Sequence, residues 1–247
     1  MKLDFDTDGG IGSRATLGVI VLETDETLEP EFARIMALEG VALYHSRIPM
    51  VPEIRPDTLA KMEGDLPASA RLFPQSLDFD VIGYGCTSAS TVIGSDNVAR
   101  AVQTVFPDAR VSDPLAAVVA AARALEAGRL GFITPYVPEV SGRMRQKLEE
   151  AGFEIAGFGS FEEGDDRVVA RITERAIVAA ARQVAAAAPC DAIVISCTNL
   201  RCLGVIDEIE AATGLPVITS NQALAWHMLR LAKVSDALPV LGQLGGR

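Results

Sequence analysis

The segment that decides the fold is Asp80-Val81-Ile82-Gly83-Tyr84-Gly85-Cys86-Thr87-Ser88-Ala89-Ser90, in which a short apolar run ends at a cysteine and two hydroxyl residues. The pattern returns 111 residues later, in Ala192-Ile193-Val194-Ile195-Ser196-Cys197-Thr198-Asn199. Short apolar runs rich in Val and Ile are typical of buried strands in parallel sheets. The small polar residues after each run are typical of helix N-termini. Each segment therefore predicts a strand, a cysteine at its end, and a helix.

The position of the two cysteines indicates their chemistry. At the start of a helix the backbone N–H groups point outward and the helix dipole is positive, and both effects favour a thiolate over a thiol. We therefore expect Cys86 and Cys197 to be activated cysteines. The twin motif outweighs the alternative that each is a small buried hydrophobic residue. Cys190 and Cys202 have no counterpart in the other half of the chain, so we expect them to be inert.

Strands and helices alternate along the chain, and the pattern runs twice. Leu17-Gly18-Val19-Ile20 corresponds to Leu130-Gly131-Phe132-Ile133, and the first glycine precedes Cys86 by 68 residues where the second precedes Cys197 by 66. The sequence thus predicts an α/β fold of two pseudo-symmetric, Rossmann-like αβα domains with parallel sheets. Ligands bind at the carboxyl ends of the strands in such sheets, so we expect both cysteines to line one cleft between the domains.

The boundaries of the parts follow from this repeat. We expect a flexible leader over residues 1–14, an N-terminal domain over 15–113 and 222–247, and a C-terminal domain over 114–221. Within the second half, the pattern predicts one long helix from Asp166 to Ala187. It also predicts a helix that follows Cys197 and ends at about Ala212.

The composition favours a small-molecule partner. The formal net charge of -11, the pI near 4.7 and the lack of any Lys/Arg cluster argue against binding to nucleic acid or to an anionic membrane. No apolar stretch reaches membrane-spanning length and the N-terminus is acidic, so we expect a cytoplasmic protein with reduced thiols. Four cysteines without a CxxC pair, and only two histidines, argue against a metal site.

Three features carry a resemblance to a known family: the paired Cys-Thr motifs, the segment Thr134-Pro135-Tyr136-Val137-Pro138, and Ser220-Asn221-Gln222-Ala223. They resemble the aspartate/glutamate racemase superfamily, and within it the branch of maleate cis-trans isomerases and arylmalonate decarboxylases. Residues 86–90 and the Thr-Asp pair at 24–25 are similar to the ectoine-utilisation A proteins. The resemblance implies two αβα domains around a cleft, chemistry without a metal or organic cofactor, and a homo-oligomer.

The resemblance also implies roles for particular residues. Cys86 and Cys197 form the catalytic pair, and Tyr136 faces the substrate. The residues after each cysteine are expected to hold a substrate carboxylate, and the charge that develops on it, through backbone N–H groups and hydroxyls. These residues are Thr87, Ser88, Thr198 and Asn199.

Two departures from the maleate isomerase pattern concern the substrate. Where those enzymes carry asparagines that hold substrate carboxylate, this sequence has Asp25 and Asp166. An ionised aspartate repels a carboxylate and only accepts hydrogen bonds. Maleate, with two carboxylates, is therefore disfavoured. A substrate with an ammonium or amide N–H suits the two aspartates, for instance an acetylated diaminobutyrate.

The leading functional hypothesis is a cofactor-independent isomerase, a racemase or epimerase. One thiolate removes a proton from the carbon next to a carboxylate, and the other thiol returns a proton on the opposite face. Three alternatives stay open: a maleate cis-trans isomerase in which Cys86 adds to the double bond, an arylmalonate-type decarboxylase, and a ligand-binding module without turnover. The decarboxylases are expected to carry glycine in place of the first cysteine, so Cys86 favours isomerisation.

Overall fold

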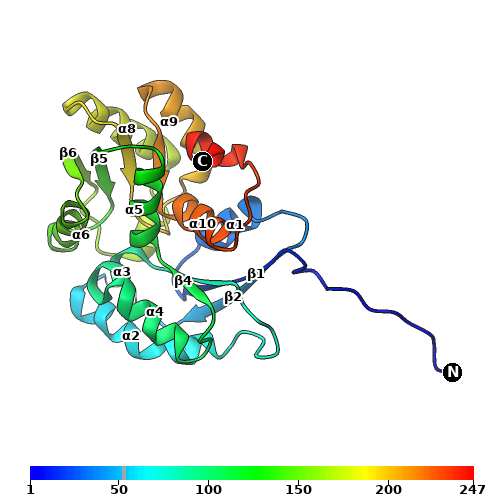
Figure 1. Ribbon diagram of the computed structural model, residues 1–247. Helices are drawn as coiled ribbons and strands as arrows, with labels where there is room; N and C mark the ends of the chain where they lie inside the picture. Colours follow the sequence, from blue (N-terminus) through cyan, green and yellow to red (C-terminus); the bar gives the residue numbers. More distant parts are fainter. Residues whose placement is uncertain (52–53) are drawn as a thin grey trace.

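Two four-stranded parallel sheets organise the computed structural model, which describes residues 1–51 and 54–247 (Figure 1). The first has the order β2-β1-β3-β4 and the second the order β6-β5-β7-β8, so that each strand of one half has an equivalent in the other. The strands are β1 (Ala15–Leu22), β2 (Val41–Ile48), β3 (Val81–Gly85), β4 (Arg110–Ser112), β5 (Arg129–Thr134), β6 (Glu154–Ser160), β7 (Ala192–Ile195) and β8 (Val217–Thr219). The predicted α/β fold with two related halves is confirmed.

Helices flank both sheets. They are α1 (Leu28–Ile35), α2 (Pro56–Ala70), α3 (Thr87–Ile93), α4 (Ser95–Gln103), α5 (Pro114–Ala124), α6 (Pro138–Glu150), α7 (Asp166–Val169), α8 (Glu174–Ala187), α9 (Ile206–Thr213) and α10 (Ser220–Leu231), with 3-10 turns η1 (Leu203–Val205) and η2 (Pro239–Gly246). Helix α10 follows the last strand of the second sheet but packs against β3, β4 and α1 of the first half, and against α5. It therefore connects the two halves. The proposed domain boundaries stay a prediction.

Two predicted helices of the second half are wrong in part. The stretch from Asp166 to Ala187 is broken into α7 and α8, because the Thr173 side chain accepts the N–H of Ala176 at 3.2 Å and starts a new helix. No helix begins directly after Cys197 either. The chain makes a turn there, and helical structure resumes only at η1 and α9.

Glycines in β3 let two helices approach the strand that leads to Cys86. A Cβ atom at Gly83 would lie 2.5 Å from Met228 Sδ of α10, and one at Gly85 would lie 2.5 Å from Leu28 Cδ1 of α1. Both distances are far below ordinary packing contacts, so the Met228 or Leu28 side chain would have to shift to admit a larger residue. The glycines thus let Leu28, at the N-terminal end of α1, and Met228, in the C-terminal half of α10, pack closely on β3.

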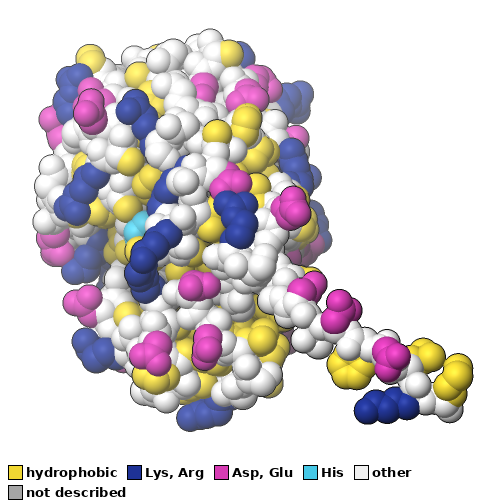
Figure 2. Space-filling model, turned by 45° about the vertical axis from the view of Figure 1, so that its right-hand side comes forward, with side chains coloured by type: hydrophobic (Ala, Val, Ile, Leu, Met, Phe, Trp, Pro, Cys, Tyr) yellow, Lys and Arg dark blue, Asp and Glu magenta, His cyan; other side chains and the backbone are white. Residues whose placement is uncertain are grey.

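Residues 1–14 extend away from the body of the molecule (Figures 1 and 2) and are almost wholly exposed. On the face that Figure 2 shows, basic and acidic side chains are intermingled over the body. None of the helices in the described residues is both long and apolar enough to span a membrane.

Candidate active site

Cys86 lies between β3 and α3, where it is the N-cap of the helix. Its Sγ accepts the backbone N–H of Ala89 at 3.4 Å and lies 3.6 Å from Ser88 Oγ. The side chain is buried. The predicted strand, cysteine and helix are therefore confirmed in the first half.

Cys197 follows β7 and sits in a turn. Its Sγ accepts the backbone N–H of Asn199 at 3.3 Å. Tyr136, from the loop after β5, is buried, and its phenol lowers the pKa of the Cys197 thiol. Burial raises the pKa of Tyr136 well above its ordinary value, and Cys197 and Cys86 raise it further. One buried phenol is thus close to both cysteines.

Hydrogen bonds join the two cysteine motifs directly. The Ser220 hydroxyl accepts the backbone N–H of Cys197 at 3.0 Å and lies 2.9 Å from the Thr87 hydroxyl. The Thr198 hydroxyl donates to the carbonyl oxygen of Gly85 at 3.4 Å. The residue next to each cysteine is therefore tied to the other motif, and the two strand ends meet at one place.

The two aspartates that the sequence singled out lie at the same place. Asp25 Oδ1 accepts the backbone N–H groups of Thr27 and Leu28 at 2.8 and 2.7 Å, which caps the start of α1. Asp25 Oδ2 is buried and accepts no hydrogen bond within residues 1–51 and 54–247. Asp166 Oδ2 accepts the Thr24 hydroxyl at 2.6 Å. The partners of both carboxylates are neutral, so the negative charge there is not balanced by these contacts.

Asn199 holds the turn after Cys197. Its Nδ2 donates to the carbonyl oxygen of Asp166 at 3.1 Å, and its Oδ1 accepts the backbone N–H of Glu26 at 2.9 Å. Its own carbonyl accepts the Thr27 hydroxyl at 3.0 Å. Both ends of the amide therefore bind protein groups, which docks the start of α1 onto the Cys197 turn.

Each residue predicted for the site is buried, and contacts or charge interactions connect them. They are Asp25, Cys86, Thr87, Ser88, Tyr136, Asp166, Cys197, Thr198 and Asn199. Their roles toward a substrate stay predictions. The described part of the chain contains no cluster of three His, Cys, Asp or Glu side chains arranged to hold a metal ion.

Burial opposes the lowering of the thiol pKa values that the helix N-termini were expected to produce. Burial raises the pKa of Cys86 to about 12, which outweighs the N–H and hydroxyl groups around its sulfur. Burial also raises the pKa of Cys197 well above its ordinary value, and Asp166 raises it further, while Tyr136 lowers it. Both groups are therefore neutral thiols at rest. A position at a strand end was not enough to lower the thiol pKa values, because desolvation and nearby carboxylates raise them.

Burial also raises the pKa values of the two carboxyl groups. Burial raises the pKa of Asp25 to about 6, although the two N–H groups that cap α1 lower it. Burial likewise raises the pKa of Asp166, against the hydrogen bond from Thr24. The site thus gathers four acidic groups whose charged forms all cost free energy until a positive or hydrogen-bond-donating ligand arrives.

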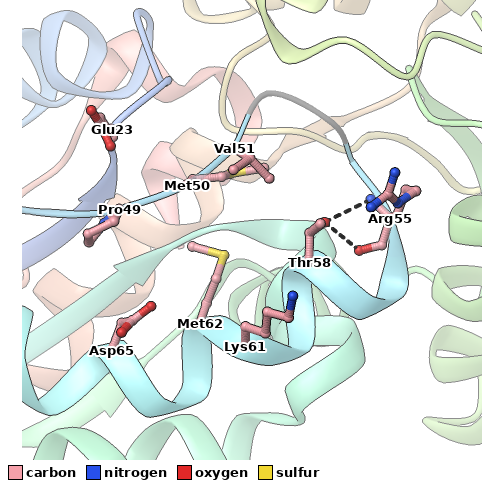
Figure 3. A pocket seen from close by; sticks show the side chains of 9 residues that line it. All are labelled: Glu23, Pro49, Met50, Val51, Arg55, Thr58, Lys61, Met62 and Asp65. Carbon is pink, nitrogen blue, oxygen red and sulfur yellow. Dashed lines mark hydrogen bonds between the residues drawn. The ribbon is translucent and has the colours of Figure 1, made fainter.

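Figure 3 shows a cavity of about 530 Å³ between the loop at Met50 and helix α2. Thr24, which binds Asp166, lies 3.8 Å from the sulfur of Met50 in its wall, and the Tyr84 hydroxyl lies 3.5 Å from the sulfur of Met62. Methionines thus separate the cavity from the cysteine region. The lining residues are Glu23, Pro49, Met50, Val51, Arg55, Thr58, Lys61, Met62 and Asp65.

Several residues of this region were given no site role from the sequence, although Thr24, Ser220 and Asn221 belong to segments that carry the family resemblance. Glu31, Ser220 and Asn221 are buried polar residues that contact the Cys197 turn, and Thr24 binds Asp166. One signal was available: Ser220 and Asn221 are adjacent polar residues in a helix that is otherwise apolar and buried. Glu31 gave no signal, because an acidic residue in the first turn of a helix is ordinary.

A family model described as arylmalonate decarboxylase matches residues 101–244, which is more than half of the chain. The chain belongs to the arylmalonate decarboxylase family. Among its relatives, the arylmalonate decarboxylase of Bordetella bronchiseptica is 32% identical over 117 residues, which are 47% of this chain and 49% of that protein. The maleate isomerase of Nocardia farcinica is 28% identical over 238 residues, which are 92% of this chain and 94% of that protein.

This member of the arylmalonate decarboxylase family also matches solved structures over nearly its whole length. One is a mutant of the Nocardia farcinica maleate cis-trans isomerase with a covalently bound succinylcysteine intermediate. The TM-score is 0.85 at 26% identity, and the match covers 94% of this chain and 98% of the other. The predicted branch of maleate isomerases and arylmalonate decarboxylases is confirmed.

Proposed function

We propose that the protein is a cofactor-independent isomerase that uses Cys86 and Cys197 to racemise or epimerise a small amino-acid-derived carboxylate. One sulfur removes a proton from the carbon next to the carboxylate, and the other delivers a proton to the opposite face. The two strand ends that carry the sulfurs meet through the Ser220 and Thr198 contacts, which supports a shared site.

The observation that carries the proposal is the orphaned oxygen of Asp25. Asp25 Oδ2 is buried without a hydrogen bond in the part of the chain that the structure describes. Such an atom costs free energy unless a ligand satisfies it. The charges of Asp25 and Asp166 both act on the two thiols, so the missing donor belongs beside the sulfurs. An ammonium or amide N–H next to the reacting carbon fits this position.

Such a ligand would also change the protonation of the thiols. With no ligand, the nearby carboxylates and burial hold both sulfurs neutral. A substrate N–H or ammonium that binds Asp25 and Asp166 offsets their charge and lowers the pKa of the adjacent thiols. Because a thiolate on one sulfur disfavours ionisation of the other, the pair then acts as one base and one acid.

The substrate class follows from the same features. An N-acylated diaminobutyrate provides a carboxylate, an amide N–H and an ammonium group. The similarity of residues 24–25 and 86–90 to the ectoine-utilisation A proteins supports a place in ectoine breakdown.

Proton NMR in deuterium oxide tests this proposal on a panel of acetylated diaminobutyrates, aspartate, maleate and a substituted malonate. We expect exchange at the α-carbon of an acylated diamino acid, absent from the Cys86→Ala/Cys197→Ala protein. Exchange that does not depend on the cysteines would contradict the proposal. Stabilisation by a panel member that survives Cys86→Ser and Cys197→Ser, with no turnover in the parent protein, would indicate a ligand-binding module instead.

A second candidate is cis-trans isomerisation of maleate through a Cys86 adduct. The succinylcysteine in the related isomerase mutant favours it. The Cys86 sulfur would add to one carbon of the double bond, the adjacent carbon would gain a proton, and rotation and elimination would give fumarate. Rapid quench followed by mass spectrometry of Cys86 decides this point: an increment equal to the mass of maleic acid supports the adduct, and an unmodified cysteine during turnover excludes it.

A further inference from the structure

Glu31 is a buried carboxylate of the first half that contacts the turn carrying Cys197 in the second half. Its Oε1 accepts the backbone N–H groups of Cys202 and Leu203 at 2.9 and 2.8 Å. These two N–H groups stand at the start of η1, where the turn ends. One carboxylate oxygen therefore fixes the far end of the turn.

The other oxygen reaches the near end through Asn221. Glu31 Oε2 accepts Asn221 Nδ2 at 2.8 Å, and the same Nδ2 donates to the carbonyl oxygen of Thr198 at 2.7 Å. Thr198 directly follows Cys197. The carboxylate is thus bound to both ends of the turn, directly at Cys202 and through one amide at Thr198.

The charged form of Glu31 is unfavourable in these surroundings. The donors to Glu31 are neutral, and burial raises the pKa of Glu31 to about 7, with Asp25 raising it further. The other titratable group in contact is Cys202, whose backbone N–H lies at 2.9 Å and whose pKa burial raises. A buried carboxylate with neutral partners costs more than a well-packed apolar side chain would. The position therefore favours a role in placing the turn over a role in stability.

We propose that Glu31 is a positioning residue whose carboxylate holds the Thr198–Cys202 turn, and with it the Cys197 sulfur, in register with the Cys86 sulfur. The proposal rests on the proposed function, because it places Glu31 behind the two-cysteine pair. It adds a residue of helix α1 to the determinants of Cys197 geometry.

The variant Glu31→Gln separates the two oxygens. Oε1 and the side-chain length are kept, but Nε2 now faces Asn221 Nδ2, and two amide donors oppose each other. If Asn221 turns its oxygen toward Gln, the Thr198 carbonyl loses its donor. Either arrangement loosens the turn at Thr198 while the contacts with Cys202 and Leu203 remain.

Alkylation of the native full-length chain by iodoacetamide, followed by mass spectrometry of each cysteine, measures this loosening without a substrate. A buried thiol is labelled through local opening of the segment that covers it. We expect Glu31→Gln to speed the labelling of Cys197 about tenfold, the effect of losing one buried hydrogen bond, with Cys86 and Cys190 unchanged. Equal labelling of Cys197 in both proteins, or a common rise at all three cysteines, would overturn the proposal.

A matched control and a second variant complete the test. Glu210 also accepts backbone N–H groups, those of Val217 and Gln243, so Glu210→Gln should leave the labelling of Cys197 unchanged. Asn221→Ala removes the hydrogen bonds of Asn221 Nδ2 to Glu31 and Thr198 and keeps those of Glu31 Oε1, so it should also speed Cys197 labelling, whether or not Glu31→Gln folds. A Cys197 rate in Asn221→Ala equal to that of the parent chain would contradict the proposal.

Turnover kinetics distinguish a positioning residue from one that only stabilises the fold. On a substrate that responds, Glu31→Gln should lower kcat about tenfold and change KM less than twofold, since the substrate contacts are intact. A raised KM at unchanged kcat would contradict a positioning role. If labelling behaves as expected and no acylated amino acid reacts, the assignment of the substrate fails while the assignment of Glu31 holds.

Discussion

The hydroxyls of Thr87 and Ser220 lie 2.9 Å apart, although Thr87 follows Cys86 and Ser220 begins α10, 133 positions later in the chain. Ser220 also accepts the backbone N–H of Cys197 at 3.0 Å, so this pair joins the residue after Cys86 to the backbone of Cys197. All three groups are buried. The relative position of the two sulfurs thus depends on a helix that starts after the last strand of the second sheet.

Replacing Ser220 by Ala tests this link. We expect the free energy of unfolding to fall by about 1–3 kcal/mol, because the Cys197 N–H is left buried without an acceptor. Turnover should fall about tenfold. Denaturant titration and steady-state kinetics measure the two effects. Ser46→Ala is the control, since it removes a buried hydrogen bond to the Ser69 carbonyl without contacting the site, and it should lower stability alone. Equal turnover in the two variants would argue against the link.

Asp25→Asn should change the ligand preference of the site. The asparagine oxygen can still accept the N–H groups of Thr27 and Leu28, while its amide places a donor where the orphaned Oδ2 stood. We expect the affinity for maleate to rise about tenfold and exchange on an acylated diamino acid to fall about tenfold. Calorimetry and NMR measure these changes. Asp113→Asn, at a buried cap of α5, serves as the control, and a gain for maleate there would undermine the interpretation.

The raised carboxyl pKa values make stability depend on pH. Glu31 titrates at about 7 and Asp25 at about 6 in the folded protein, above their ordinary values near 4. The folded chain therefore binds more protons than the unfolded chain between about pH 4 and 7, so the stability that these groups contribute is lost as pH rises through their folded pKa values. We expect the free energy of unfolding to fall with rising pH less steeply in Asp25→Asn/Glu31→Gln than in the parent. Parallel slopes in urea titrations from pH 5.5 to 8 would refute this.

Tyr136→Phe should impair Cys197 selectively. The phenol lowers the pKa of the Cys197 thiol, so its loss raises that pKa further and leaves less thiolate at neutral pH. We expect turnover to fall about 10- to 100-fold, the effect of one hydrogen bond to a charged group, and the rising limb of the pH–rate profile to move to higher pH. Tyr44→Phe, outside the site, should leave the profile in place. A Tyr136→Phe profile that superposes on that of the parent would rule out this role.

The repeat in the sequence predicted both sheets and the proximity of the two cysteine motifs. It did so because the same order of strands and helices, with nearly the same spacing, occurs in each half. Gly18 and Gly131 occupy matching strands, β1 and β5, and each pairs with the strand that leads to a cysteine. The candidate residues Asp25 and Asp166, 141 positions apart, are both close enough to act on the thiols. The repeat was sufficient to predict the sheets and the cysteines, whereas Asp25 and Asp166 were found through the resemblance to the maleate isomerases.

Other features depend on tertiary contacts that no local pattern encodes. The turn after Cys197 replaces the expected helix because contacts with Thr27, Glu31 and Asn221 hold its N–H and carbonyl groups. The neutral thiols result from complete burial, which a strand-end position does not reveal. Glu31 and Cys202 are 171 positions apart, so their contact depends on how α1 packs against the second half and not on any local sequence pattern.

Proton exchange in deuterium oxide by single-cysteine variants measures whether Cys86 and Cys197 serve opposite faces of one carbon. With each enantiomer of the responding substrate offered separately, we expect Cys86→Ala and Cys197→Ala each to stop racemisation. Each should retain deuterium exchange on one enantiomer only, opposite in the two variants. Racemisation that persists in either variant, or exchange of the same enantiomer in both, would contradict the account.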